Sequence, residues 1–85
     1  MELTAIYPNP FNSTMTIKFS LPSQGKVVLR VFDLTGREIA LLENRSIEAG
    51  NHSVVWDAGN FTSGIYVCHL EVNGITKSRK LILTK

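Results

Sequence analysis

Apolar and polar residues alternate with a period of two along most of this chain. The clearest case is Thr14–Leu21, in which the apolar residues Met15, Ile17, Phe19 and Leu21 share one parity. Because successive side chains of a β-strand point to opposite faces, this pattern is typical of a strand with one buried face. No segment carries a helical stripe longer than a turn or two, so the chain is predicted to be all-β.

Six further segments fit strands, with a less regular pattern in the third: Leu3–Tyr7, Lys26–Asp33, Arg37–Glu43, Asn51–Trp56, Ile65–Val72 and Ile75–Leu83. Ala40–Asn44 would also suit a short helix. Short strands at 8–12-residue spacing without intervening helices indicate a sandwich or a barrel. About seven strands in this length favour one antiparallel β-sandwich domain over residues 1–85.

Turn residues separate these strands. Asp33-Leu34-Thr35-Gly36 fits a type I turn closed by a glycine with positive φ, and Asn73-Gly74 is a strong two-residue hairpin signal. Thr62-Ser63-Gly64 is predicted to turn into the strand that begins at Ile65. Gly36 and Gly64 are therefore expected to have structural roles.

The core of the sandwich is expected to hold the apolar residues that share one face of each strand. Trp56 alternates with Val54, so it is predicted to be buried rather than to form a stacking surface for sugars. The predicted core consists of Ile17, Phe19, Leu29, Val31, Val54, Trp56, Tyr66, Leu70 and Leu81.

Charge and cysteine content limit the classes of function that this chain can have. Nine Lys and Arg against seven Asp and Glu give a net charge of +2, too small for a nucleic-acid-binding footprint. The densest basic stretch, Lys77, Arg79 and Lys80, is interpreted as the solvated face of a strand. Cys68 is the single cysteine, so no internal disulfide can form. The start at Met1 lacks the pattern of a signal peptide, and we expect the chain to be a fragment of a larger secreted protein.

Candidate chemical groups do not form a recognised constellation. His52 is interpreted as structural, and adjacent Cys68 and His69 would point to opposite sheet faces. Asp33 and Asp57 are expected to accept main-chain hydrogen bonds at turns. We therefore predict a protein that is not an enzyme, with no catalytic, metal-binding or cofactor-binding residues. Weak calcium binding near Asp57 stays open, as do glycans at the N-x-S/T triplets, which are first interpreted as turn chemistry. These triplets begin at Asn12, Asn44, Asn51 and Asn60.

Several short blocks, read in order, are familiar. They are Tyr7-Pro8-Asn9-Pro10-Phe11-Asn12, Thr16 to Pro22, Val31 to Glu38, Ala49 to Asp57, Ser63-Gly64-Ile65-Tyr66 and Lys80 to Lys85. Together they resemble the type A C-terminal sorting domain of the bacterial type IX secretion system, which is related to an immunoglobulin-like domain of a flagellar hook-assembly protein. The departures are small: Ser13 stands where the family often has proline, and Cys68 where it often has an aromatic residue.

This resemblance implies an immunoglobulin-like sandwich that acts as a sorting signal. The implied partners are an N-terminal cargo domain in the same chain, the outer-membrane export machinery and a surface sortase-like protease. The implied route is periplasmic transit, then the cell surface or the medium. No nucleic acid partner is expected, and the domain is expected to be monomeric. The implied recognition residues are the last strand and terminal residues Arg79, Lys80, Leu81, Ile82, Leu83, Thr84 and Lys85.

Two alternatives to the sorting signal stay open. One is a structural immunoglobulin-like accessory module, which a parent protein continuing past Lys85 would favour. The other is a carbohydrate-binding module of a secreted enzyme, which would need Trp56 or Tyr66 exposed on one face. The sequence does not identify the cargo, the organism, or whether the domain is cleaved.

Overall fold

The computed structural model describes residues 1–85 and contains seven strands and no helix. The all-β prediction is therefore confirmed. The strands are β1 (Glu2–Tyr7), β2 (Thr14–Leu21), β3 (Gly25–Asp33), β4 (Glu38–Ile47), β5 (Gly50–Asp57), β6 (Gly64–Val72) and β7 (Ile75–Leu83).

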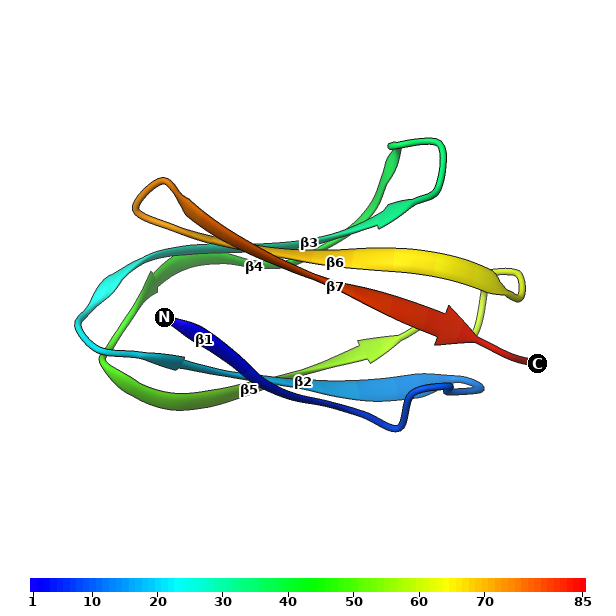
Figure 1. Cartoon of the computed structure of the whole chain (residues 1–85), viewed down its shortest axis with the longest axis horizontal. Helices are drawn as coiled ribbons and strands as arrows, with labels where there is room; N and C mark the ends of the chain where they lie inside the picture. Colours follow the sequence, from blue (N-terminus) through cyan, green and yellow to red (C-terminus); the bar gives the residue numbers. More distant parts are fainter.

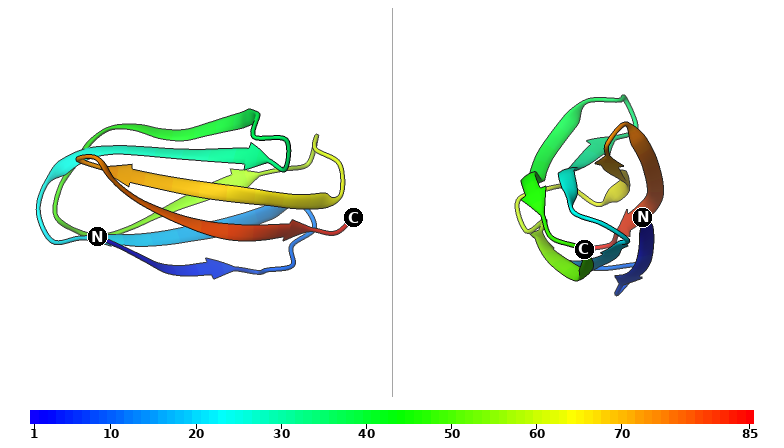
Figure 2. Two further views of the ribbon diagram at one scale, coloured as in Figure 1. Left: turned by 45° about the horizontal axis from the view of Figure 1, so that its top comes forward. Right: turned by 90° about the vertical axis from the view of Figure 1, so that its left-hand side faces the viewer.

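The strands form two antiparallel sheets that pack face to face (Figure 1). One sheet has the order β1-β2-β5 and the other β4-β3-β6-β7. Hairpins join β1 to β2, β3 to β4 and β6 to β7, whereas the chain changes sheet between β2 and β3, β4 and β5, and β5 and β6. Seen end-on in Figure 2, edge strands β1 and β7 lie on one side of the sandwich, and β4 and β5 on the other. This arrangement agrees with the predicted immunoglobulin-like sandwich.

The space between the sheets is filled by eighteen buried residues, and none of them is charged. All predicted core residues except Val54 are buried; Val54 is partly buried because it lies on the edge strand β5. The structure also buries Phe11 and Ala58, which lie in loops and so have no strand pattern. The other buried residues outside the predicted core are Leu3, Met15, Leu21, Val27, Ile47, Cys68, Val72 and Leu83.

The fourth strand is longer than the sequence predicts. The pattern suggested a strand over Arg37–Glu43, but β4 extends to Ile47, and the suggestion of a short helix at Ala40–Asn44 is wrong. The register between β3 and β4 shifts at Leu29/Arg30 and again at Val31/Phe32. Each shift changes which residues of β4 oppose β3, so the alternation in this strand is broken.

The predicted hairpin turns are confirmed. Gly36 has a φ of 87°, and its N–H donates to the Asp33 carbonyl at 3.1 Å. The Asp33 carboxylate accepts hydrogen bonds from the Thr35 hydroxyl and from the Thr35 and Arg37 N–H groups, and these bonds, with the Thr35 hydroxyl first, hold the pKa of Asp33 below its usual value. Asn73 and Gly74 both have positive φ, as a tight two-residue hairpin requires.

An aromatic cluster closes the end of the sandwich where β7 finishes. The Trp56 ring packs against the rings of Phe11, Phe61 and Tyr66, with centroids 5.6 to 5.7 Å apart. The Tyr66 hydroxyl donates a hydrogen bond of 2.6 Å to the Thr62 carbonyl. A tyrosine at the start of a strand that bonds back to the preceding corner is a feature of immunoglobulin-like sandwiches.

Candidate recognition surface

Strand β7 carries most of the predicted recognition residues and lies at the edge of the four-stranded sheet. Leu81 and Leu83 point into the core and are buried. Lys77 and Arg79 share the parity of Leu81 and Leu83 but are exposed, because the first part of β7 lies at the edge of its sheet. The residues of the other parity, among them Lys80 and Ile82, face outward from the sheet.

The outer edge of the last part of β7 is occupied by the segment that follows β1. The Asn9 carboxamide accepts from the Ile82 N–H at 2.9 Å and donates to the Lys80 carbonyl at 3.1 Å. Farther along, the Phe11 N–H donates to the Ile82 carbonyl at 2.9 Å, and the Thr84 N–H donates to the Phe11 carbonyl at 2.8 Å. Asn9 and Phe11 therefore act together as a short parallel strand beside Lys80–Thr84.

The final residues are also held against the body of the domain. The Lys85 N–H donates to the Ser63 hydroxyl at 3.0 Å, and the Lys85 ammonium donates to the Gly59 carbonyl at 2.6 Å. Of the seven predicted recognition residues, Leu81 and Leu83 are buried, and the other five each contribute at least one hydrogen bond outside the regular strand pairing of β6 and β7. The chain end is thus an ordered part of the sandwich.

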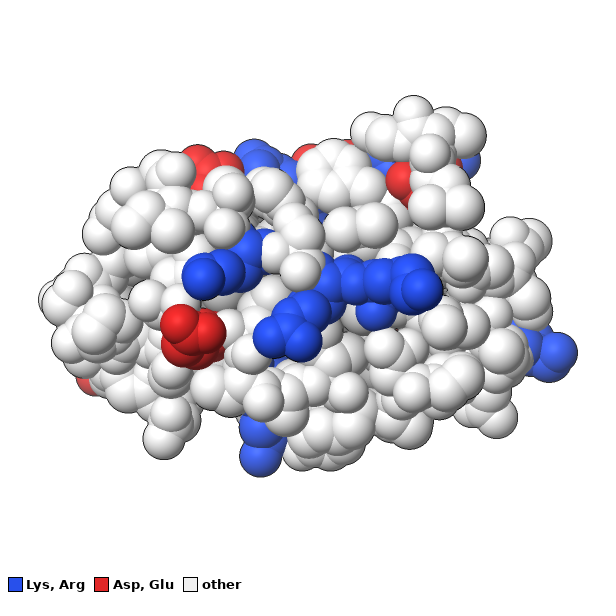
Figure 3. All heavy atoms as spheres, viewed as in Figure 1, with Lys and Arg blue, Asp and Glu red and all other residues white.

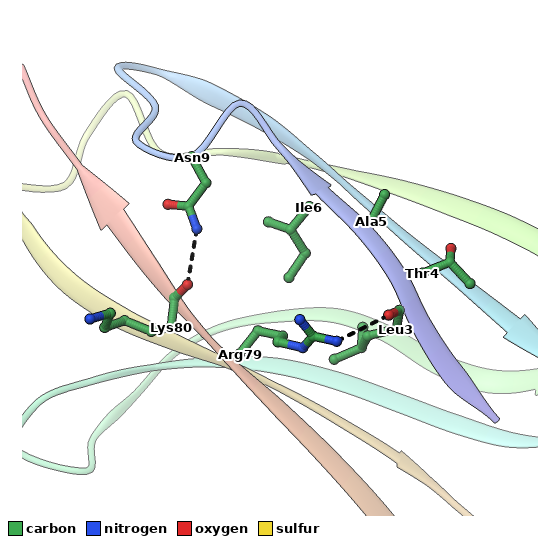
Figure 4. Close-up of a pocket in the computed structure, with 7 residues that line it drawn as sticks. All are labelled: Leu3, Thr4, Ala5, Ile6, Asn9, Arg79 and Lys80. Carbon is green, nitrogen blue, oxygen red and sulfur yellow. Dashed lines mark hydrogen bonds between the residues drawn. The ribbon is translucent and has the colours of Figure 1, made fainter.

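Lys and Arg side chains gather along β7 on one face of the molecule (Figure 3). The side chains of Lys77 and Lys80 make no hydrogen bond or ion pair. The Arg79 guanidinium reaches across to β1 and donates to the Leu3 carbonyl at 3.4 Å. Figure 4 shows this contact at one end of a groove of about 180 Å³ between β1 and β7, with the Asn9–Lys80 hydrogen bond at the other end. Basic groups thus flank a groove between two sheet edges.

The remaining candidate groups take part in local structure. His52 Nε2 lies 2.7 Å from the Glu48 carbonyl oxygen, and His69 Nδ1 lies 2.9 Å from the Ser78 hydroxyl. The Asp57 carboxylate accepts from the Gly59 N–H at 3.0 Å, as predicted for a turn. No group of three or more His, Cys, Asp and Glu side chains comes together. The structure has no helix long and apolar enough to span a membrane.

The structure bears on the carbohydrate-binding alternative and on the interpretation of the N-x-S/T triplets. Trp56 and Tyr66 are only 3% and 6% exposed, so neither can present a ring face to a sugar. Asn44 and Asn51 lie within β4 and β5, so the interpretation of their N-x-S/T triplets as turn chemistry is wrong. Asn12 and Asn60 do lie in loops.

The role of Asn9 and Phe11 was not found from the sequence. They belong to the Pro-rich block that contributes to the family resemblance, but that block carries no alternation and gives no sign of a partner. Their contact with β7 joins residues more than seventy positions apart.

Comparison with known families agrees with this geometry. A family model described as "Secretion system C-terminal sorting domain" matches residues 5–84. The chain belongs to this family. The match covers every strand from the middle of β1 to the end of β7, including the Asn9–Phe11 segment. A search among curated proteins finds no match.

C-terminal sorting domains of this family are the sorting signals of type IX secretion. The machinery of that system recognises the domain, which is attached to a cargo protein and leads to export to the cell surface or the medium. The family is a family of sorting signals and not of enzymes.

Proposed function

We propose that the type IX machinery recognises this sorting domain through the last part of β7 and the two residues after it, which together are Arg79–Lys85. The cargo would precede the domain in the same chain and cross the periplasm with it, and a surface sortase-like protease would then remove the domain. In this proposal the domain acts as a monomer, binds no nucleic acid and performs no catalysis itself. The observation that carries the proposal is the ordered, basic edge strand β7.

The geometry of β7 supports recognition in two ways. Its terminal residues are tied to Asn9, Phe11 and Ser63, so a partner would meet a single shape and would lose little entropy in ordering it. Its exposed cations would attract an acidic partner surface and speed encounter.

Export of a reporter tests the proposal. The domain is fused to the C-terminus of a periplasmic reporter in a host with a compatible type IX system, and the surface-exposed reporter is measured. We expect export with the intact domain. A reporter that stays in the periplasm of several such hosts would favour a structural accessory module instead.

The test variants must leave the fold intact. Deleting Lys80–Lys85 is unsuitable, because it removes Leu81 and Leu83 from the core. Replacing Arg79 or Lys85 is also confounded, because both side chains bond to carbonyl groups of the domain. We therefore choose Lys80→Gln with Ile82→Thr, both on the outward parity of β7, and Lys26→Gln in β3 as a control.

We expect the Lys80→Gln, Ile82→Thr variant to reduce surface reporter while its melting temperature stays within a few degrees of the parent. Lys80 is exposed, and exposed substitutions usually change stability by no more than about 0.5 kcal/mol, whereas Ile82 is partly buried, so its replacement should account for most of the loss of stability. Lys26→Gln should export normally. Full export of the double variant would contradict recognition through the terminal strand.

A further inference from the structure

The outer edge of β7 is divided into an occupied half and an open half. In an antiparallel strand the N–H and C=O of one residue point to the same side, and the side alternates along the strand. The Lys80 carbonyl, the Ile82 peptide groups and the Thr84 N–H all face the Asn9–Phe11 segment. By the same alternation, Ser78 and Thr76 direct their peptide groups to this edge. They have no partner strand there, because β7 pairs with β6 on its other side and its bridge to Phe11 lies farther along, at Leu83.

The open half of the β7 edge faces β1, which pairs only with β2. Figures 1 and 2 both show β7 and β1 drawing apart towards the β6–β7 hairpin. At the narrower end lies the groove of about 180 Å³, into which Ile6 points between Asn9 and Arg79 (Figure 4). An added strand would therefore place its peptide groups against Thr76 and Ser78 and one side chain over the groove.

Charge selects the kind of strand that fits. Lys77 and Arg79 lie in this half of β7 and Lys80 lies where the occupied half begins, and facing strand β1 contributes one acidic residue, Glu2. Lys77 and Lys80 have no ion-pair partner. A second copy of this chain would bring the same three cations to the edge, and like charges facing each other on neighbouring strands are destabilising. Acidic side chains on the added strand would instead be attracted.

We propose that the open half of β7, from Thr76 to Arg79, accepts an extended acidic segment of the export machinery as an added β-strand. This inference rests on the proposed function and deepens it. It places strand addition in the first part of β7, away from the terminal residues whose edge Asn9 and Phe11 already occupy. Main-chain hydrogen bonds would supply affinity, and the cations would select acidic sequences.

A labelled peptide tests the binding chemistry on the isolated chain. The probe is a fluorescein-labelled eight-residue peptide of alternating Glu and Val, compared with one in which Lys replaces Glu and one in which Pro replaces two of the Val residues. We expect only the Glu/Val peptide to bind, with affinity that falls as salt rises. The bound peptide should shift the amide NMR signals of Thr76, Ser78 and Lys80.

Protein variants test the location. Ser78→Pro removes one of the two outward N–H groups of the open half, those of Thr76 and Ser78, and should weaken peptide binding at least tenfold. Lys77→Gln should weaken it several-fold, whereas Lys26→Gln, with the same charge change on β3, should not. Melting curves check that each variant is folded. Equal binding of the Lys/Val peptide, no effect of Ser78→Pro, or amide shifts away from β7 would overturn the proposal. So would a dimer in sedimentation that Ser78→Pro abolishes, since the occupant would then be a second copy.

The export assay separates this inference from the proposed function. If the intact domain directs export and the Lys77→Gln, Ser78→Pro double variant does not while staying folded, the added strand is supported. Normal export of that variant would overturn the inference and leave the proposed function standing. Failure of the intact domain to direct export would instead contradict the proposed function, whatever the peptide result.

Discussion

The carboxamide of Asn9 pairs with the main chain of Ile82 as the peptide group of a neighbouring strand would. Its oxygen accepts from the Ile82 N–H at 2.9 Å, while its nitrogen donates to the Lys80 carbonyl at 3.1 Å. The two partners also define the orientation of the amide. One side chain from the segment after β1 therefore covers the last strand and closes the sandwich at that corner.

Replacing Asn9 with leucine removes both hydrogen bonds at nearly constant side-chain volume. We expect the free energy of unfolding to fall by about 1–3 kcal/mol, because each of the two bonds contributes roughly 0.5–1.5 kcal/mol net. Urea unfolding followed by fluorescence gives the value. Asn12→Leu is the matched control, since the Asn12 side chain is exposed and makes no hydrogen bond. Equal losses in the two variants would show that Asn9 does not stabilise β7.

Trp56→Ala should lower the stability of the domain more than any exposed substitution. The indole is 3% exposed and contacts the rings of Phe11, Phe61 and Tyr66, so truncation leaves a large cavity. The expected cost is about 3–5 kcal/mol, against a total stability of about 5–15 kcal/mol for small domains. Calorimetry measures the change in melting temperature. Tyr7→Ala is the control, because Tyr7 is 46% exposed and its truncation should cost far less. Equal melting temperatures of the two variants would contradict the burial of Trp56.

Gly36→Val tests the turn between β3 and β4. A Cβ at this position would meet no atom within 4 Å, so we expect the cost to arise mainly from the φ of 87°. A β-branched residue in the left-handed region costs about 1–2 kcal/mol or more. Gly36→Asn should cost less, because asparagine tolerates this conformation. Chemical denaturation compares the two variants, and equal stability of valine, asparagine and glycine would contradict the assigned turn.

Cys68 should be inert in the folded domain. Burial raises the pKa of the thiol from 9.0 to about 11, and the thiolate is the reactive form. At pH 8 a thiol-specific disulfide reagent should therefore label the native protein only through unfolding, and labelling should speed up as urea is added. Rapid labelling without denaturant would show that the side chain is accessible.

The same pKa shift predicts a change of stability at alkaline pH. The folded thiol holds its proton to higher pH than the unfolded thiol, so its contribution is complete below pH 9 and is lost as pH rises towards 11. Cys68→Ala should lack this part of the decline. The difference between the two unfolding curves from pH 8 to pH 11 isolates the effect from other titrating groups. A constant difference would contradict the shift.

Local pattern was enough to predict the number of strands and the tight turns, but not the full length of β4. The alternation of Met15, Ile17, Phe19 and Leu21 predicted a strand and its buried face, because side-chain direction in a strand depends only on position along it. Asp33–Gly36 and Asn73-Gly74 predicted their turns, because glycine and asparagine adopt positive φ more readily than other residues do. The ordered blocks of the sequence, ending at Lys85, indicated the family before any contact was known.

Only the tertiary structure determined how those strands meet. The burial of Phe11 and Ala58, the shifted register of β4 and the pairing of Asn9 with β7 each depend on a neighbour that local pattern does not specify. The structure places the predicted recognition strand at a sheet edge, and the division of that edge into a covered and an open half was not predictable from the sequence. Asn9 and Ile82 are 73 residues apart, and the two sheets must pack before these residues can form their hydrogen bond.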